Sequence, residues 1–125
     1  MIPVTVVRNG EGPALLTGGN HGDEYEGPIA LSDLARSLKP EDVTGAVIIV
    51  PAMNYSAFLS GTRTSPIDRG NMNRSFPGAP DGTVTQKIAD YFQPIPAAVS
   101  RYRAGLEGAG AAMIEARISG MGRFR

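Results

Sequence analysis

The run Ala46-Val47-Ile48-Ile49-Val50 is apolar throughout and mostly β-branched. A strand with one face in water alternates apolar and polar residues, whereas a strand buried on both faces is an unbroken apolar run. We therefore expect this segment to be a strand inside a sheet that is covered on both sides.

The segments before this run alternate between strand and helix patterns. Short apolar stretches at residues 4–8 and 13–17 predict two strands, each followed by residues that form turns. Between residues 25 and 38, apolar side chains recur three and four residues apart, which predicts a helix with one buried face.

A long polar segment follows the apolar run. Residues 54–82 are expected to form a loop, and a last helix is expected over residues 83–92, where Thr83 and Gln86 form the pattern of a capping box. The order of strands and helices indicates the α/β class, a sandwich with a mostly parallel sheet.

The composition is typical of a soluble globular domain and excludes several classes of protein. Hydrophobic residues make up 42% and charged residues 19% of the 125 residues. Twelve basic residues balance twelve acidic ones, so no basic surface that would bind nucleic acid or a membrane is indicated. The absence of cysteine excludes disulfides and thiol nucleophiles. No signal peptide or membrane span is recognisable, so we expect a cytoplasmic protein.

Residues 94–125 differ in composition from the rest of the chain. Alanine, glycine and arginine fill 17 of these 32 positions. The net charge moves from −3 over residues 1–93 (seven basic, ten acidic) to +3 (five basic, two acidic). A weak helix is expected around residues 104–118, because each glycine there lowers helix stability by roughly 1 kcal/mol relative to alanine. We interpret this segment as encoded in a shifted reading frame and therefore not the natural continuation of the fold. The alternative is a genuine tail that is flexible and disordered.

The segment Gly18-Gly19-Asn20-His21-Gly22-Asp23-Glu24 lies where a strand is expected to end and a helix to begin. Open α/β sheets bind ligands at such junctions, beyond the carboxyl ends of their strands. His21 and Glu24 stand three residues apart with a glycine between them, so an imidazole nitrogen and a carboxylate oxygen can converge on one ion. Zinc binds such ligands at about 2.0–2.2 Å. The alternative is a capped helix start beside a solvated or core histidine.

A second group of polar residues lies in the expected loop. Residues 61–78 read Gly-Thr-Arg-Thr-Ser-Pro-Ile-Asp-Arg-Gly-Asn-Met-Asn-Arg-Ser-Phe-Pro-Gly, with three arginines, two asparagines and an aspartate. A loop of this length is more often functional than idle. Arginine presents a planar fork that matches a carboxylate, and asparagine adds a donor and an acceptor in one plane. The loop therefore indicates binding of a small anion, and the alternative is a solvated surface loop.

Together the two segments resemble the succinylglutamate desuccinylase/aspartoacylase family, relatives of the zinc carboxypeptidases. The motifs are Gly-Gly-Asn-His-Gly-Asp-Glu-Tyr-Glu-Gly-Pro and Thr-Arg-x-x-Pro-Ile-Asp-x-x-Asn-Met-Asn-Arg-x-Phe-Pro-Gly. Within the family they are most similar to the N-acetyl-diaminobutyrate deacetylases of ectoine breakdown. The resemblance covers residues 1–93 and implies the N-terminal part of a zinc hydrolase catalytic domain, with a partial three-layer sandwich fold.

The resemblance implies a metal site and a reaction. His21 and Glu24 would be ligands of one zinc ion, and Arg63 would polarise the scissile carbonyl and hold the oxyanion. The implied activity is the zinc-dependent hydrolysis of the amide bond in an N-acyl amino acid.

The resemblance also implies a substrate site for a small anion. Asn73 and Arg74 would bind the substrate carboxylate, and Asp68 would orient the loop that carries them.

The family pattern further needs a histidine as third zinc ligand and a later glutamate as general base. The single histidine of this chain is already assigned, and Glu107 and Glu115 lie in the tail without a motif around them. We therefore expect an incomplete site with two protein ligands and little or no turnover. A sheet cut after about three strands exposes an edge and an apolar face, so we expect the chain to be marginally stable, self-associating, or both. A non-catalytic metal- or carboxylate-binding fragment and a zinc carboxypeptidase are the alternatives.

Overall fold

The structure, a computed structural model, describes residues 1–93. Its elements are β1 (Thr5–Asn9), β2 (Pro13–Thr17), α1 (Glu26–Ser37), the 3-10 helix η1 (Pro40–Asp42), β3 (Gly45–Val50), α2 (Tyr55–Ser60), α3 (Met72–Ser75) and α4 (Val84–Phe92). The weak helix expected around residues 104–118 and the interpretation of residues 94–125 fall outside the described residues.

The apolar run forms β3, the central strand of a sheet with the order β1-β3-β2. Strand β2 pairs with β3 in parallel, with Leu15 opposite Ile48, and β1 pairs with it antiparallel, with Val6 opposite the same residue. The sheet of residues 1–93 is therefore mixed rather than mostly parallel, which corrects the prediction. The short turn between β1 and β2 reverses the chain, so β3 cannot run parallel to both when it enters between them.

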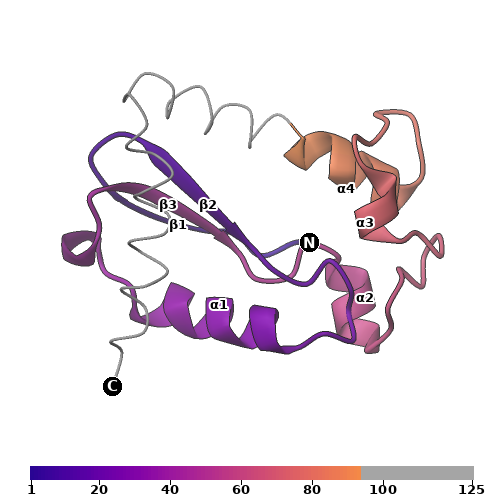
Figure 1. Ribbon diagram of the computed structural model, residues 1–125, viewed down its shortest axis with the longest axis horizontal. Coiled ribbons are helices and arrows are strands. Elements are labelled where there is room, and N and C mark those ends of the chain that lie inside the picture. The colour runs from indigo at the N-terminus through magenta and orange to yellow at the C-terminus, as the bar shows by residue number, and fades with distance from the viewer. Residues whose placement is uncertain (94–125) are drawn as a thin grey trace.

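The side chains of β3 are buried against helices on both faces of the sheet. Val47 and Ile49 pack with Leu34 of α1, whereas Val50 packs with Met72 of α3 and Phe92 of α4. Successive side chains of a strand point to opposite faces, so an unbroken apolar run serves two cores at once. Figure 1 shows α1 on one side of the sheet and α3 with α4 on the other, a layered α/β arrangement.

The segment at residues 54–82, predicted as one loop, contains α2 and α3. Each begins at an asparagine whose side-chain oxygen accepts a backbone hydrogen bond: Asn54 from Ala57 N at 3.4 Å, and Asn71 from Asn73 N at 3.1 Å. Helices of six and four residues are too short to show a recognisable apolar period. The prediction of an uninterrupted loop is therefore wrong.

The predicted start of α4 is confirmed. The hydroxyl of Thr83 accepts from Gln86 N at 3.4 Å, and the side chain of Gln86 accepts from Thr83 N at 2.9 Å. These two contacts form the capping box that the spacing of a threonine and a glutamine predicted.

Within residues 1–93, no helix combines the length and the apolar content needed to cross a membrane. The cytoplasmic location stays a prediction.

Candidate metal and substrate site

The loop between β2 and α1 carries the predicted zinc ligands and is anchored to the end of β3. Backbone hydrogen bonds of 2.8–3.0 Å join Gly18 and Gly19 to residues 50–54. Gly22 lies so close to α2 that an added Cβ would stand 2.0 Å from the backbone carbonyl carbon of Ala57. Glycine at this position is therefore what allows the loop to pack against α2.

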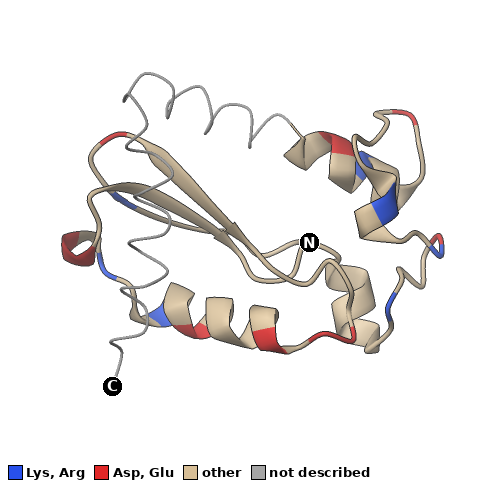
Figure 2. Cartoon of the chain, viewed as in Figure 1, with Lys and Arg blue, Asp and Glu red and all other residues tan. Residues whose placement is uncertain are grey.

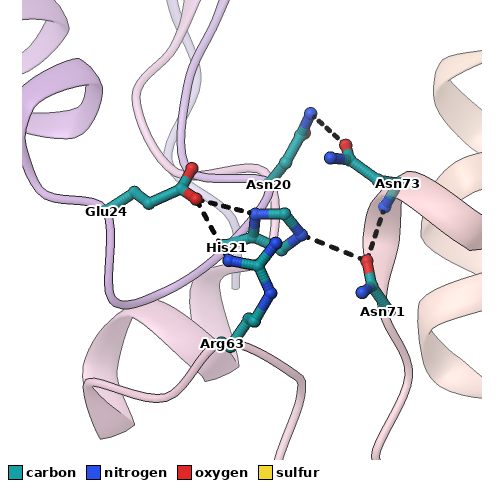
Figure 3. Close-up of polar contacts among 6 residues, drawn as sticks. All are labelled: Asn20, His21, Glu24, Arg63, Asn71 and Asn73. Atoms are coloured by element: carbon teal, nitrogen blue, oxygen red, sulfur yellow. Dashed lines mark hydrogen bonds and ion pairs between the residues drawn. The ribbon is translucent and has the colours of Figure 1, made fainter.

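His21 is buried, with 4% of its surface exposed, and both of its ring nitrogens face oxygen atoms. Its Nδ1 lies 3.0 Å from Oε1 of Glu24, and its Nε2 lies 3.2 Å from Oδ1 of Asn71 (Figure 3). Neutral imidazole has one N–H and can satisfy only one of two accepting oxygens. A cation shared by Nδ1 and Glu24, with the N–H of Nε2 donated to Asn71, would satisfy both. Histidines that bind metals usually donate their second ring N–H to an oxygen in this way.

Arg63 reaches the same carboxylate from the segment after α2. Its NH1 donates to Oε1 of Glu24 at 3.2 Å, and both side chains are more than half exposed. The hydrogen bond with His21 lowers the pKa of the Glu24 carboxyl, and the hydrogen bond and charge of Arg63 act in the same direction, against the effect of burial. An exposed ion pair contributes little to stability. The ion pair between Arg63 and Glu24 is therefore a weak structural contact.

The short helix α3 carries the two residues predicted to bind a carboxylate. The amide oxygen of Asn71 that faces His21 also accepts from Asn73 N, so one side chain contacts both the proposed metal ligand and the helix. The side chain of Asn20 donates from Nδ2 to Oδ1 of Asn73 at 2.8 Å. Arg74 is exposed, and no hydrogen bond or ion pair joins its guanidinium to another of residues 1–93.

Asp68 is fully engaged by its own loop and by α4. Its carboxylate accepts hydrogen bonds from the N–H and the hydroxyl of Thr85, both at 2.7 Å, and from Gly70 N at 2.9 Å. Burial opposes ionisation, but these hydrogen bonds outweigh it and hold the pKa of Asp68 well below its usual range. These contacts hold the loop against the start of α4. The partners of Asp68 are two backbone N–H groups and one hydroxyl, so its carboxylate contributes to the fold of the loop.

Charges of opposite sign lie on the segments that form the site. Figure 2 shows acidic residues in the loop before α1 and at the start of that helix, and basic residues in the segment after α2 and on α3.

Across residues 1–93, no three His, Cys, Asp or Glu side chains come together as a metal site. His21 and Glu24 therefore stand as a pair of donors.

Asn20 and Asn71 were not among the predicted site residues, although both stand inside the motifs. An asparagine just before a helix is an N-cap pattern, which could have indicated Asn71. Asn20 had no local signal, because its partner Asn73 is 53 residues away.

The sequence and the fold match one family of proteins. The succinylglutamate desuccinylase/aspartoacylase catalytic domain matches residues 12–104. The chain belongs to this family, as the two motifs predicted. The family consists of deacylases, which are hydrolytic enzymes.

Individual relatives of the chain carry more specific names than the family. The chain is 71% identical over 93 residues to the N-alpha-acetyl-L-2,4-diaminobutyric acid deacetylase of Halomonas elongata, a match that covers 74% of this chain and 27% of the relative. It is 73% identical to the ectoine utilization protein EutE (DoeB) of Ruegeria pomeroyi in its product-bound structure, with a TM-score of 0.72 over 74% of this chain and 29% of that one. A succinylglutamate desuccinylase from a Silicibacter species gives the same TM-score and coverage at 71% identity. The chain thus spans less than a third of the length of these relatives.

Proposed function

We propose that residues 1–93 supply a zinc-binding pair and a carboxylate-binding helix of an amidohydrolase that removes the acyl group from a small N-acyl amino acid. The observation that carries the proposal is the 3.0 Å contact between Nδ1 of His21 and Oε1 of Glu24, with Arg63 on the same oxygen at 3.2 Å. The named relatives support a deacylase over a carboxypeptidase, since one is a deacetylase of an N-acetylated diamino acid and another a desuccinylase.

The donor pair fits a zinc ion. Zinc binds an imidazole nitrogen and a carboxylate oxygen at about 2.0–2.2 Å, and two such donors on a tetrahedral ion lie roughly 3.3 Å apart. The observed separation of 3.0 Å between Nδ1 and Oε1 is close to this value. When bound, zinc would supply a water of lowered pKa and polarise the carbonyl of the amide.

Arg63 would stabilise the negative charge that develops on the substrate. Its guanidinium is exposed and held only by Glu24 among residues 1–93, so a carboxylate that turns to a metal ion leaves it available for the carbonyl oxygen of the scissile amide. A donor that meets an oxyanion typically lowers the barrier by about 3–4 kcal/mol.

Asn73 and Arg74 would bind the carboxylate of the substrate. They are adjacent on α3, and both are exposed. The guanidinium offers two parallel N–H donors to a carboxylate, and the asparagine amide adds a third. This pair would select a substrate that carries a carboxylate, as an N-acyl amino acid does.

Zinc titration by isothermal calorimetry tests the metal assignment. We expect one zinc ion per chain that a chelator removes. The loss of even an outer-shell partner typically costs roughly 10–100-fold in affinity, so His21→Ala and Glu24→Gln should each weaken binding by at least that factor. Glu26→Gln is the matched control, because Glu26 stands in the first turn of α1 and makes the same chemical change outside the pair. Equal affinity in Glu24→Gln and Glu26→Gln would remove the ligand assignment.

Acetate release separates catalysis from binding alone. Incubation of the chain and zinc with N-acetyl-L-2,4-diaminobutyric acid, followed by proton NMR, measures hydrolysis directly. Release that depends on His21 supports a complete active site, whereas zinc binding without release supports the non-catalytic fragment.

A further inference from the structure

Among residues 1–93, the Asn73 amide has a hydrogen-bond partner at its oxygen and none at its nitrogen. Its oxygen accepts the hydrogen bond from Asn20 Nδ2 at 2.8 Å. Figure 3 shows no contact of the Asn73 amide nitrogen with the other five residues drawn. The nitrogen, with its two N–H donors, is therefore the end that can meet a ligand.

Asn20 is set in a loop that leaves it little freedom. The two residues before it are joined to residues 50–54 by backbone hydrogen bonds. Its side-chain oxygen is buried and has no hydrogen-bond partner among residues 1–93. The side chain is turned so that its N–H group, and not its oxygen, meets Asn73. Among residues 1–93, Oδ1 of Asn73 is the acceptor that this N–H group has.

We propose that Asn20 is a positioning residue that holds the Asn73 amide with its nitrogen toward the carboxylate of the substrate. This inference rests on the proposed role of Asn73 in carboxylate binding. An amide that is free can rotate by half a turn and present its oxygen, which would repel a carboxylate. The Asn20 donor needs an acceptor, so it retains the Asn73 oxygen. The Asn73 nitrogen then faces the ligand, and this orientation of the amide favours an anionic ligand over a neutral one.

The test uses an isosteric change at Asn20. Aspartate has the shape of asparagine but only accepts hydrogen bonds, so in Asn20→Asp the Asn73 amide should turn its nitrogen inward and lose it for the ligand. The probe is N-acetyl-L-2,4-diaminobutyric acid, titrated into the chain at a constant zinc concentration and followed by NMR. We expect Asn73→Ala and Asn20→Asp each to raise Kd by roughly tenfold, as for the loss of one hydrogen bond to a charged group. Asn20→Ala should raise it less, because the Asn73 amide then rotates freely.

The double variant separates positioning from simple charge repulsion. In an Asn73→Ala background, Asn20→Asp should weaken binding far less than in the native chain, since there is no amide left to turn. Asn9→Asp adds the same charge at an exposed position at the end of β1 and should leave Kd unchanged.

The outcomes distinguish the two proposals. Unchanged binding in Asn73→Ala would overturn the carboxylate role of Asn73 and this inference with it. A weakened Asn73→Ala with native binding in Asn20→Asp, or with an equal effect of Asn20→Asp in both backgrounds, would overturn the inference alone. The side-chain amide signals of Asn20 in the unaltered chain give a readout that needs no variant to fold. We expect a nuclear Overhauser effect between these protons and the side chain of Asn73, and its absence would contradict the contact.

Discussion

Asp68→Asn is expected to lower the free energy of unfolding at pH 7 by about 2–3 kcal/mol, because charge-assisted hydrogen bonds contribute about 1.5–3 kcal/mol each. Three donors meet this carboxylate: the N–H and the hydroxyl of Thr85, one on each oxygen, and Gly70 N. Asparagine offers one oxygen and one NH2 group, so at least one donor faces another donor. Thr85 is fully buried, and water cannot replace the lost acceptor. The remaining hydrogen bonds also lose their charge.

The effect of pH follows from the depressed pKa of Asp68. A carboxyl whose pKa is lower in the folded than in the unfolded chain stabilises the fold above the unfolded value of about 4 and loses that contribution as the pH falls toward the folded value. The difference between the native chain and Asp68→Asn should therefore stay constant from pH 7 to about 5. Below about pH 4 it should shrink by up to about 1.4 kcal/mol per pH unit.

Urea denaturation followed by circular dichroism at pH 7, 5 and 3 measures both effects. Asp81→Asn is the matched control, because Asp81 is exposed in the same region and makes the same chemical change without a buried partner. It should stay within about 0.5 kcal/mol of the native chain. Asp68→Asn is preferred to Asp68→Ala, which leaves all three donors without an acceptor. Equal stability of the Asp68 and Asp81 variants, or a difference that does not change with pH, would refute the reasoning.

Three further predictions concern the loop, the last helix and the ligand. Gly22→Ala should abolish zinc binding and strongly destabilise the chain, because its Cβ would overlap the backbone of α2 at 2.0 Å. Gly27→Ala is the control, because its Cβ meets no atom nearer than 3.8 Å. This variant should be tolerated or should stabilise α1 by up to about 1 kcal/mol. Thr83→Ala should lower the free energy of unfolding by about 1 kcal/mol through loss of the N-cap, and no change in urea midpoint would contradict the capping box. Arg74→Ala should raise Kd for N-acetyl-L-2,4-diaminobutyric acid. Arg74→Lys should recover binding only in part, because an ammonium group lacks the bidentate fork of a guanidinium. Arg69→Ala should bind the ligand as the native chain does.

The regular elements were predicted well where their signal is local. The observed bounds of β1, β2, α1, β3 and α4 lie within one residue of the predicted ones. An apolar run, a helical period and a capping box each depend on residues that are neighbours in sequence, so the pattern itself contains the interaction. The helices α2 and α3 were missed because each is stabilised by a single asparagine cap and not by a period.

The sheet order could not be predicted in the same way. Strand β3 is apolar enough to be central, but nothing in its residues determines that it enters between β1 and β2 or that β1 runs opposite to it. That choice depends on the turn before β2 and on the packing of α1, which are properties of the folded chain.

The sequence by itself predicted that His21 and Glu24 can meet, because a separation of three residues around a glycine allows the two side chains to converge, and the structure places Nδ1 and Oε1 3.0 Å apart. Only the tertiary structure decided what surrounds that pair. Arg63 meets Glu24 across 39 residues, Asn71 meets His21 across 50, and Asn73 meets Asn20 across 53. Contacts at such separations depend on the direction in which β3, α2 and the loop before α3 leave one another. Those directions depend on all the backbone dihedral angles between the partners, and no local sequence pattern predicts them.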